Sequence, residues 1–173
     1  ILLFTFTNKA AKEIKQRVGT AIGYKLADKI TTGTYHSFCC RLLRKYGDKL
    51  GYKKGWSIYD SEDSKKVVNR LVKGTAINAS SVISYISLQK RNLKSPAQSL
   101  QNINETDLAN MYDLYQKELM NDNAMDFDDL IYNVIKLLKN NIDVKSKVNN
   151  KYKYIVSDEF QDSASSDIEL IRL

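Results

Sequence analysis

The first residues of the chain, Ile1–Thr7, are mostly apolar, β-branched or aromatic, which is typical of a strand covered on both faces. Thr7 or Asn8 is placed to cap a helix after it, in which Ile14 and Val18 recur at helical spacing on one face. The pattern therefore predicts a buried strand followed by an amphipathic helix.

A second strand is predicted at Ile30–Tyr35, where Gly33 interrupts an otherwise β-prone run. A helix is expected after it, since Phe38, Leu42 and Tyr46 recur every four residues. The order strand, helix, strand, helix is the pattern of parallel strands joined by crossovers.

The middle of the chain shows only helical spacing of its apolar residues, with a break at Pro96, the one proline. The groups are Val67, Val68, Leu71 and Val72; Val82, Ile83 and Ile86; and Leu108, Met111, Tyr112, Tyr115 and Leu119. Farther on, Asp126 is placed to cap another helix, and Tyr152–Val156 predicts a last short strand.

These elements predict an α/β fold, in which a parallel sheet with helices is interrupted by an all-helical insertion. The expected segments are 1–47 as the first part of the core, 48–125 as the insertion and 126–173 as the return to the core. The chain lacks an initiator Met and both of its ends fall inside predicted elements, so we expect a fragment of a larger protein.

Composition excludes several classes of protein. Apolar residues make up 43% of the chain, which is enough for a core and argues against general disorder. The apolar runs are far shorter than the roughly 20 residues that cross a bilayer, and the pattern of a signal peptide is not seen, so we expect none. Adjacent Cys39 and Cys40 and a single histidine build neither a disulfide framework nor a four-ligand Cys/His zinc site, so a cytoplasmic location fits best.

Positive charge is concentrated in the first third of the chain. Residues 1–55 carry twelve basic and three acidic residues, a net charge of +9, whereas residues 56–125 are neutral and residues 126–173 carry −2. Such a segment favours a polyanionic partner, most often nucleic acid. A solvated, lysine-rich surface is the alternative that composition leaves open.

The strongest chemical signal is the pair of carboxylates, Asp158 and Glu159, directly after the last predicted strand. Ligands of open α/β sheets bind beyond the carboxyl ends of the strands, and two adjacent, partly buried carboxylates call for a cation or a proton. In one interpretation, Asp158 holds a phosphate-bound Mg²⁺ and Glu159 accepts a proton from the attacking water. In the other, both simply favour the dipole of a following helix.

Four segments resemble motifs of superfamily 1 helicases of the UvrD/PcrA/Rep type and stand in that family's order. Thr5–Ala11 matches motif Ia (TFTNKAA) without a mismatch, and Gly33–Phe38 resembles motif Ib (GTFHSF). Met125–Leu130 resembles the DFDDL segment, and Val156–Ser163 resembles motif II, the Walker B box (DEFQDT or DEYQDT). The resemblance implies a partial RecA-like core with a helical insertion.

Three residues depart from the family pattern. Tyr35 replaces a phenylalanine, Ser157 stands where an apolar residue is usual, and Ser163 where threonine is usual. The string GxxxxGK[ST] of the phosphate loop does not occur in this sequence. The resemblance therefore implies that these 173 residues are inactive by themselves.

By resemblance, the cofactors are ATP and Mg²⁺, Asp158 is the metal ligand and Glu159 the catalytic base, and Gln161 couples the nucleotide site to neighbouring motifs. The residues that the family's motifs place along single-stranded DNA are Thr5, Phe6, Thr7, Asn8, Thr34 and His36. Phe6 is suited to base stacking, although Phe4 and Phe6 alternate onto the same side of a strand, so at least one of them is expected in the core.

The resemblance implies an ATP-dependent 3′–5′ DNA helicase or translocase of repair or replication. Its expected partners are single-stranded DNA, single-strand/duplex junctions and repair or replication proteins, with no membrane. Two alternatives stay open. One is the helicase part of an AddA/RecB-type helicase–nuclease. The other is a non-catalytic module that binds single-stranded DNA or docks a protein.

Overall fold

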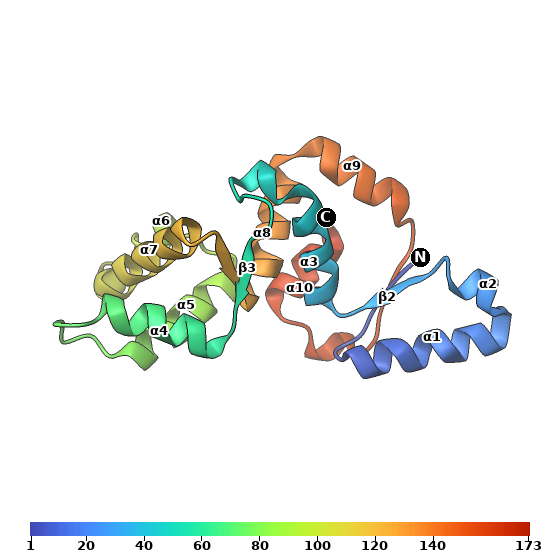
Figure 1. Cartoon of the computed structure of the whole chain (residues 1–173), viewed down its shortest axis with the longest axis horizontal. Helices are drawn as coiled ribbons and strands as arrows, with labels where there is room; N and C mark the ends of the chain where they lie inside the picture. Colours follow the sequence, from blue (N-terminus) through green and yellow to red (C-terminus); the bar gives the residue numbers. More distant parts are fainter. The chain divides into compact units, whose positions relative to one another are not determined.

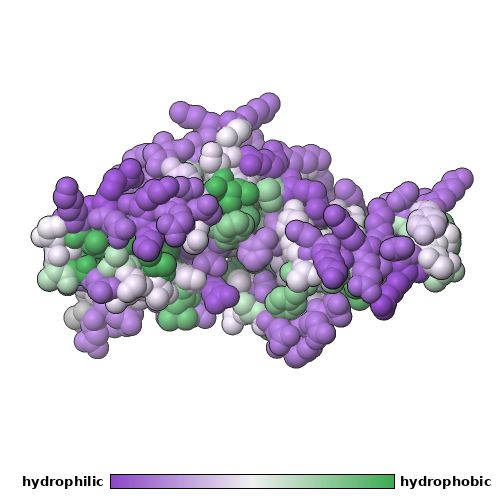
Figure 2. All heavy atoms as spheres, turned by 60° about the horizontal axis from the view of Figure 1, so that its bottom comes forward, coloured by the Kyte–Doolittle hydropathy of each residue, from purple (hydrophilic) through white to green (hydrophobic). Residues whose placement is uncertain are grey.

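The computed structural model describes residues 1–173, the side chain of Ile103 excepted. It divides into two compact units, which share one chain (Figure 1). Unit 1 consists of residues 1–46 and 134–173, and unit 2 of residues 47–133. The face drawn in Figure 2 is mostly hydrophilic, with hydrophobic residues showing in small groups, as expected where apolar side chains fill each core.

A three-stranded parallel sheet organises unit 1. Its strands are β1 (Leu2–Phe4), β2 (Thr31–Gly33) and β5 (Ile155–Ser157), in the order β2-β1-β5. Phe4 pairs with Gly33 on one side and with Ser157 on the other, so all three strands end at the same edge. The predicted α/β fold with a parallel sheet is confirmed.

Helices connect and cover these strands. Those of unit 1 are α1 (Asn8–Ile22), α2 (Tyr24–Ala27), α3 (Tyr35–Tyr46), α9 (Ile142–Lys151), the 3₁₀ turn η3 (Phe160–Asp162) and α10 (Ser165–Arg172). Thr7 caps α1, because its hydroxyl accepts the backbone N–H of Ala10 at 3.1 Å. Of the two caps that the sequence allowed, Thr7 is therefore the one used.

Aromatic packing holds β1 against α3. The Phe4 ring stacks on Tyr35 at a centroid distance of 4.3 Å and meets Phe38 edge-on at 5.4 Å. All three side chains are buried. Aromatic pairs of this geometry contribute about 0.5–1.5 kcal/mol beyond the area they bury, so this cluster fixes the start of α3 relative to the sheet.

Unit 2 is mainly helical but contains a second small sheet. Its helical elements are η1 (Gly47–Leu50), α4 (Ser61–Leu71), α5 (Ala79–Arg91), α6 (Pro96–Ser99), η2 (Ile103–Glu105) and α7 (Thr106–Asn121). Strands β3 (Ser57–Tyr59) and β4 (Ala124–Asp126) pair in parallel. The sequence pattern missed this ladder, because Ser57–Tyr59 and Ala124–Asp126 each mix polar and apolar residues and form no β-prone run.

The core of unit 2 lies among α4, α5 and α7. Its buried members are Val67, Val68, Val82, Tyr85, Ile86, Ala109, Tyr112, Tyr115 and Leu119. Most of the apolar positions singled out by helical spacing fall in this cluster, which explains why the periodicity of the middle segment was informative.

Helix α8 (Phe127–Asn140) belongs to both units. Its first turns lie in unit 2, and residues from Val134 onward lie in unit 1. The sequence had placed this boundary between residues 125 and 126, where a new helix was expected to start. A continuous helix offers no break at which contacts change, so the boundary falls inside it.

Among the described residues, no helix is both long and apolar enough to cross a membrane.

Candidate nucleotide and nucleic-acid site

Three turns leave the same edge of the unit 1 sheet, one after each strand. The N–H of Thr5 donates to the carbonyl of Gly33 at 3.1 Å, and the N–H of Asp158 donates to the carbonyl of Phe4 at 2.9 Å. These bonds continue the parallel ladder by one residue on each side of β1. The segments that follow Phe4, Gly33 and Ser157 therefore start side by side.

The acidic pair lies on the turn after β5. Both Asp158 and Glu159 are exposed, so the expectation of partly buried carboxylates was wrong. The reason is local: the two residues follow an edge strand whose Ile155 and Val156 are 39% and 50% exposed. Solvent reaches the carboxylates, and they need no counter-charge in this state.

Glu159 adopts an unusual backbone. Its φ of 50° and ψ of 41° place it in the left-handed region, which costs a residue with a Cβ about 1–2 kcal/mol. The side-chain amide of Gln161 donates a hydrogen bond to the Glu159 carboxylate. Strain of this kind persists only where surrounding contacts hold it, and it is concentrated at functional sites.

The two carboxylates fit a magnesium ion that arrives with phosphates. No group of three or more His, Cys, Asp or Glu within the described part of the chain is arranged to hold a metal. Mg²⁺ commonly takes one or two protein carboxylates and completes its shell with water and phosphate oxygens. Asp158 and Glu159, exposed at a strand end, suit that donor set and not an all-protein cage.

The turn after β1 presents an exposed aromatic ring beside a helix N-terminus. Phe6 is 48% exposed, and Thr7 and Asn8 are exposed where α1 begins. Thr5 differs from its neighbours: it is fully buried, and its hydroxyl donates to the carbonyl of Thr7 at 2.9 Å. Thr5 therefore shapes the turn from inside, while Phe6, Thr7 and Asn8 form its surface.

The turn after β2 leads directly into α3. Thr34 caps it, because its hydroxyl accepts the N–H of Ser37 at 3.1 Å. His36 is exposed on the first turn of the helix. A Cβ at Gly33 would lie 2.7 Å from the Ser37 hydroxyl oxygen, so a larger residue there would displace the hydroxyl that donates to the Thr34 carbonyl. Thr34 and His36 thus flank the edge from which Phe6 and Asp158 also project.

Sequence reasoning treated Tyr35 and Ser157 only as departures from a pattern. In the structure their hydroxyls share a hydrogen bond of 2.6 Å, which joins the turn after β2 to the end of β5. The signal was present in the sequence, because two motifs each carried an extra hydroxyl, but pairing them requires the strand order.

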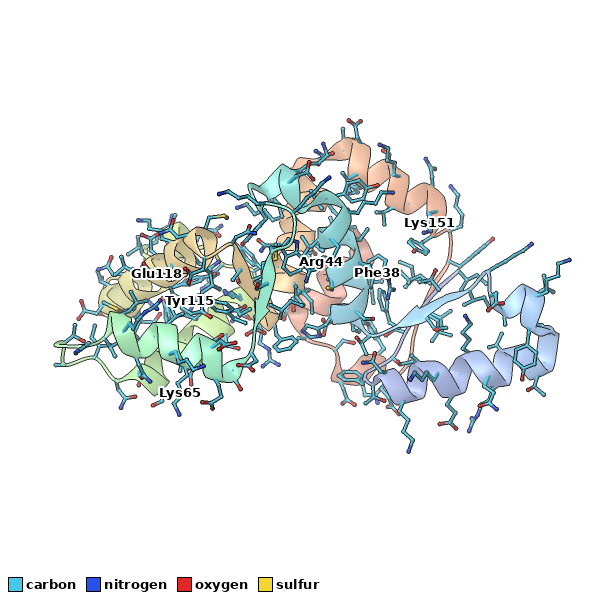
Figure 3. All side chains as sticks on the ribbon, in the orientation of Figure 1. Phe38, Arg44, Lys65, Tyr115, Glu118 and Lys151 are labelled. Carbon is cyan, nitrogen blue, oxygen red and sulfur yellow. The ribbon has the colours of Figure 1, made fainter. Side chains whose placement is uncertain are left out.

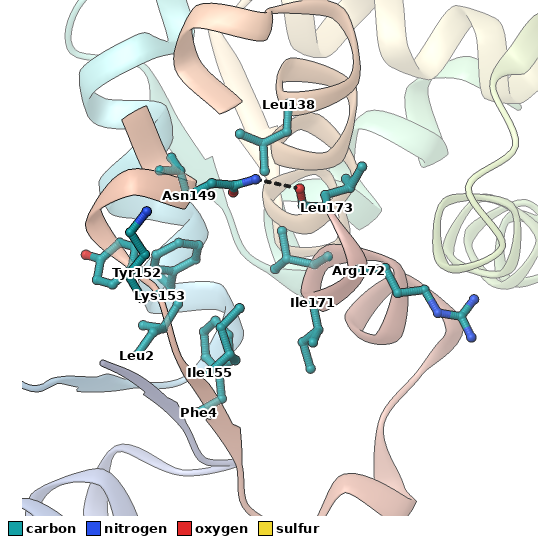
Figure 4. A pocket seen from close by; sticks show the side chains of 13 residues that line it. Leu2, Phe4, Leu138, Asn149, Tyr152, Lys153, Ile155, Ile171, Arg172 and Leu173 are labelled. Atoms are coloured by element: carbon teal, nitrogen blue, oxygen red, sulfur yellow. Dashed lines mark hydrogen bonds between the residues drawn. The ribbon is translucent and has the colours of Figure 1, made fainter. Parts of the chain in front are cut away.

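A cavity of unit 1 lies apart from the acidic pair (Figure 4). Its volume is about 340 Å³, and Leu2, Phe4 and Ile155 of the sheet form one wall. Asn149 of α9 donates to the carbonyl of Leu173 at 3.1 Å across it. Its lining mixes apolar side chains with Lys153 and Arg172, and it contains neither Asp158 nor Glu159.

Unit 2 holds a buried ion cluster where the DFDDL segment begins α8. The ammonium of Lys90 lies 2.6 Å from a carboxylate oxygen of Asp126 and 2.9 Å from one of Asp129. The backbone N–H of Asp129 donates to Asp126 and that of Asp126 donates to Asp129, at 2.8 and 3.2 Å. Asp126 and Asp129 therefore cap the start of α8 reciprocally, and the ammonium of Lys90 lies between their carboxylates.

Burial and the opposite charges set the ionisation of this cluster. Burial alone would lower the pKa of Lys90, but the Asp126 and Asp129 carboxylates raise it above its ordinary value. Burial, followed by the charge of Asp126, raises the pKa of Asp129 to about 6. Burial acts in the same direction on Asp126, yet the Lys90 ammonium lowers the pKa of that carboxyl.

Comparison with known proteins matches the whole chain. The family model for the UvrD/REP helicase N-terminal domain matches residues 1–173. The chain is 35% identical over 181 residues to a protein named ATP-dependent DNA helicase PcrA from Staphylococcus aureus (strain Mu50). It is 36% identical over 181 residues to the protein of that name from Staphylococcus epidermidis (strain RP62A).

The match covers both the α/β core and the helical unit of the chain. The chain belongs to the UvrD/REP helicase N-terminal domain family. Each of the two alignments covers all of this chain and 25% of the relative, so the chain spans about a quarter of the length of these proteins.

Proposed function

We propose that this chain is part of an ATP-dependent DNA helicase that couples hydrolysis of Mg-ATP to 3′–5′ movement on single-stranded DNA. The observation that carries the proposal is the placement of Asp158 and Glu159 at the same sheet edge as Phe6 and Thr34. The nucleotide turn follows β5 and the Phe6 turn follows the neighbouring β1. A movement of the nucleotide turn therefore has to cross only the distance between two adjacent strands to reach the DNA-binding turn.

The acidic turn supplies the hydrolytic groups. Glu159 accepts the proton of the water that attacks the terminal phosphate, and Asp158 holds the Mg²⁺ that accompanies ATP. Bound Mg²⁺ neutralises negative charge on the phosphates. The hydrogen bond from Gln161 orients the Glu159 carboxylate and provides a link to neighbouring segments. The left-handed backbone at Glu159 agrees with this assignment, because such strain is common at functional sites, and Leu93 and Asn123 of unit 2 share a positive φ without a proposed role.

The turns after β1 and β2 bind the single-stranded DNA. Phe6 offers a ring for base stacking, and the first N–H groups of α1, next to Thr7 and Asn8, favour a phosphate. Thr34 and His36 contact the sugar-phosphate backbone of the DNA. Buried Thr5 does not touch the DNA and instead positions the turn that carries Phe6. The first turn of α1 carries no acidic residue that would repel a phosphate.

The relatives bear the name ATP-dependent DNA helicase, which supports DNA as the partner and ATP as the cofactor. We extend this to single-strand/duplex junctions as the substrate, to a cytoplasmic location and to work in repair or replication.

The test is an assay of the full-length protein with ATP and Mg²⁺. We expect ATP hydrolysis to rise strongly when a single-stranded oligonucleotide is added, and duplexes with a 3′ single-stranded tail to be unwound in preference to those with a 5′ tail. Residues 1–173 alone should not turn over ATP, since they contain no GxxxxGK[ST] string. Hydrolysis that ignores DNA, or unwinding only from 5′ tails, would contradict the proposal.

A further inference from the structure

A second surface of unit 1 lies between α3 and α9, on residues that the nucleotide and strand sites do not use. It is a groove of about 280 Å³, and we call it the α3–α9 groove. Its lining residues are Phe38, Arg41, Leu42, Lys45 and Tyr46 of α3 and Lys147, Val148, Lys151 and Tyr152 at α9. Figure 3 labels Phe38 on α3 and Lys151 at the end of α9.

Both rims of the α3–α9 groove are cationic. Arg41 and Lys45 are one helical turn apart on α3, and Lys147 and Lys151 are one turn apart on α9, so each pair projects from one face of its helix. All four are exposed. Among the ion pairs of the described residues, none involves these four side chains. No acidic residue lines the groove.

The floor of the groove is apolar. Phe38 is buried at its base, and Leu42 and Val148 are half-buried beside it. The Tyr46 and Tyr152 rings each have a lysine ammonium about 5 Å from the centroid, 5.1 Å for Lys45 and 5.2 Å for Lys151. Each of these tyrosines therefore already has a cation of the same chain near one face of its ring, which leaves less of the floor open to a stacked base.

Apolar floor and cationic rims together select one kind of partner. The phosphates of a nucleic acid would pair with the rims, but its bases, which offer stacking faces, would leave the aliphatic Leu42 and Val148 of the floor unmatched. A peptide with carboxylates on its edges and one or two apolar side chains between them satisfies both. We propose that the α3–α9 groove is a docking site for an acidic, amphipathic peptide segment of a partner protein.

The experiment measures binding of a fluorescein-labelled peptide, DDLDDFDDL, to the full-length protein by fluorescence anisotropy. We expect saturable binding that weakens at high salt. Exchanging Lys45→Glu together with Lys147→Glu should weaken it about tenfold or more, because two attractive rim contacts become repulsive. The matched control, Lys25→Glu with Lys29→Glu, changes the same charge at exposed positions outside the groove and should leave binding unchanged.

Two further probes separate this proposal from its alternatives. A peptide with the leucines and phenylalanine changed to serine keeps every carboxylate, and it should bind about tenfold more weakly because the floor is unused. Equal binding of both peptides would overturn the proposal. So would a groove variant that lost affinity for an oligo(dT) strand but not for the acidic peptide, since that result would assign the groove to nucleic acid. ATP hydrolysis by the groove variant, assayed without peptide, should stay at the parent level.

Discussion

The hydroxyls of Tyr35 and Ser157 lie 2.6 Å apart and bridge the first residue of α3 to the last residue of β5. Strand β1 runs between the two segments, and its Phe4 stacks on the Tyr35 ring. The pair therefore ties the three strand ends together at the edge that carries the candidate site. Both residues depart from the apolar types of the family pattern, and the structure shows that the two departures compensate each other.

Removing either hydroxyl should loosen this edge. Tyr35→Phe leaves the partly buried Ser157 hydroxyl with only a long contact of 3.4 Å to the carbonyl of Asp158, and we expect a loss of about 1 kcal/mol. The measurement is amide hydrogen exchange of peptides spanning β2 and β5 in the full-length protein. Tyr154→Phe, at a side chain that is 71% exposed, is the control and should change nothing.

Coupling between the two residues gives a stricter check. The double variant Tyr35→Phe with Ser157→Val places apolar groups at both positions, and it should recover most of the protection lost in Tyr35→Phe. A double-mutant cycle is expected to yield a coupling of about 0.5–1 kcal/mol. Strictly additive effects would mean that the hydrogen bond contributes nothing.

Phe6 should matter for DNA and not for folding. Because its side chain is 48% exposed, Phe6→Ala should leave hydrogen exchange of β1 unchanged. Loss of a stacked base should weaken oligo(dT) binding by about 1–3 kcal/mol, measured by anisotropy at fixed salt. Tyr154→Ala removes a more exposed ring at the opposite end of β5 and should keep the parent affinity. If Phe6→Ala and the parent bound oligo(dT) with equal affinity, Phe6 would not be part of the DNA-binding surface.

Lys90 should be among the most sensitive positions of unit 2. Its side chain is fully buried and is the cation between Asp126 and Asp129. Lys90→Met leaves two buried carboxylates without it, and we expect a loss of about 3–5 kcal/mol near neutral pH. Hydrogen exchange in α5 and β4, corrected for intrinsic rates, reports the change. The exposed Lys65→Met is the matched control.

The pH dependence of that variant has a definite sign. The pKa of Asp129 is raised from 3.8 to about 6, so its protonated form favours the folded state. This contribution is complete below about pH 4 and is lost as pH rises through about 6. Without Lys90 the pKa of Asp129 rises further and the pKa of Asp126 is no longer lowered by the ammonium, so the Lys90→Met defect should shrink as pH falls toward about 5. A defect that grows on acidification would refute the ion cluster as its cause.

Periodicity in the sequence was enough for the core and most helices, because Val67, Val82 and Tyr112 are buried at the spacing that helices impose. It did not place short strands well. Tyr152, predicted to open the last strand, instead ends α9 by donating its N–H to Val148, and β5 starts at Ile155. The backbone hydrogen bond decides the boundary there, and side-chain type does not.

The candidate site was partly accessible to sequence reasoning. At least one of Phe4 and Phe6 was expected in the core, and this is confirmed, since Phe4 is 1% exposed. Phe6 emerges because the strand stops at Phe4 and the chain turns at Thr5. The ion cluster around Lys90 could not be foreseen, because it joins α5 to residues that follow much later in the chain.

The assignment of Glu159 is tested most directly by Glu159→Gln in the full-length protein, with Asp162→Asn as a matched loss of charge on the same turn. We predict that Glu159→Gln binds ATP nearly as well as the parent but loses DNA-stimulated hydrolysis by about 10²–10⁴-fold, as expected for removal of a general base. Asp162→Asn should retain most of the hydrolysis rate. Hydrolysis by Glu159→Gln at the parent rate would contradict the account.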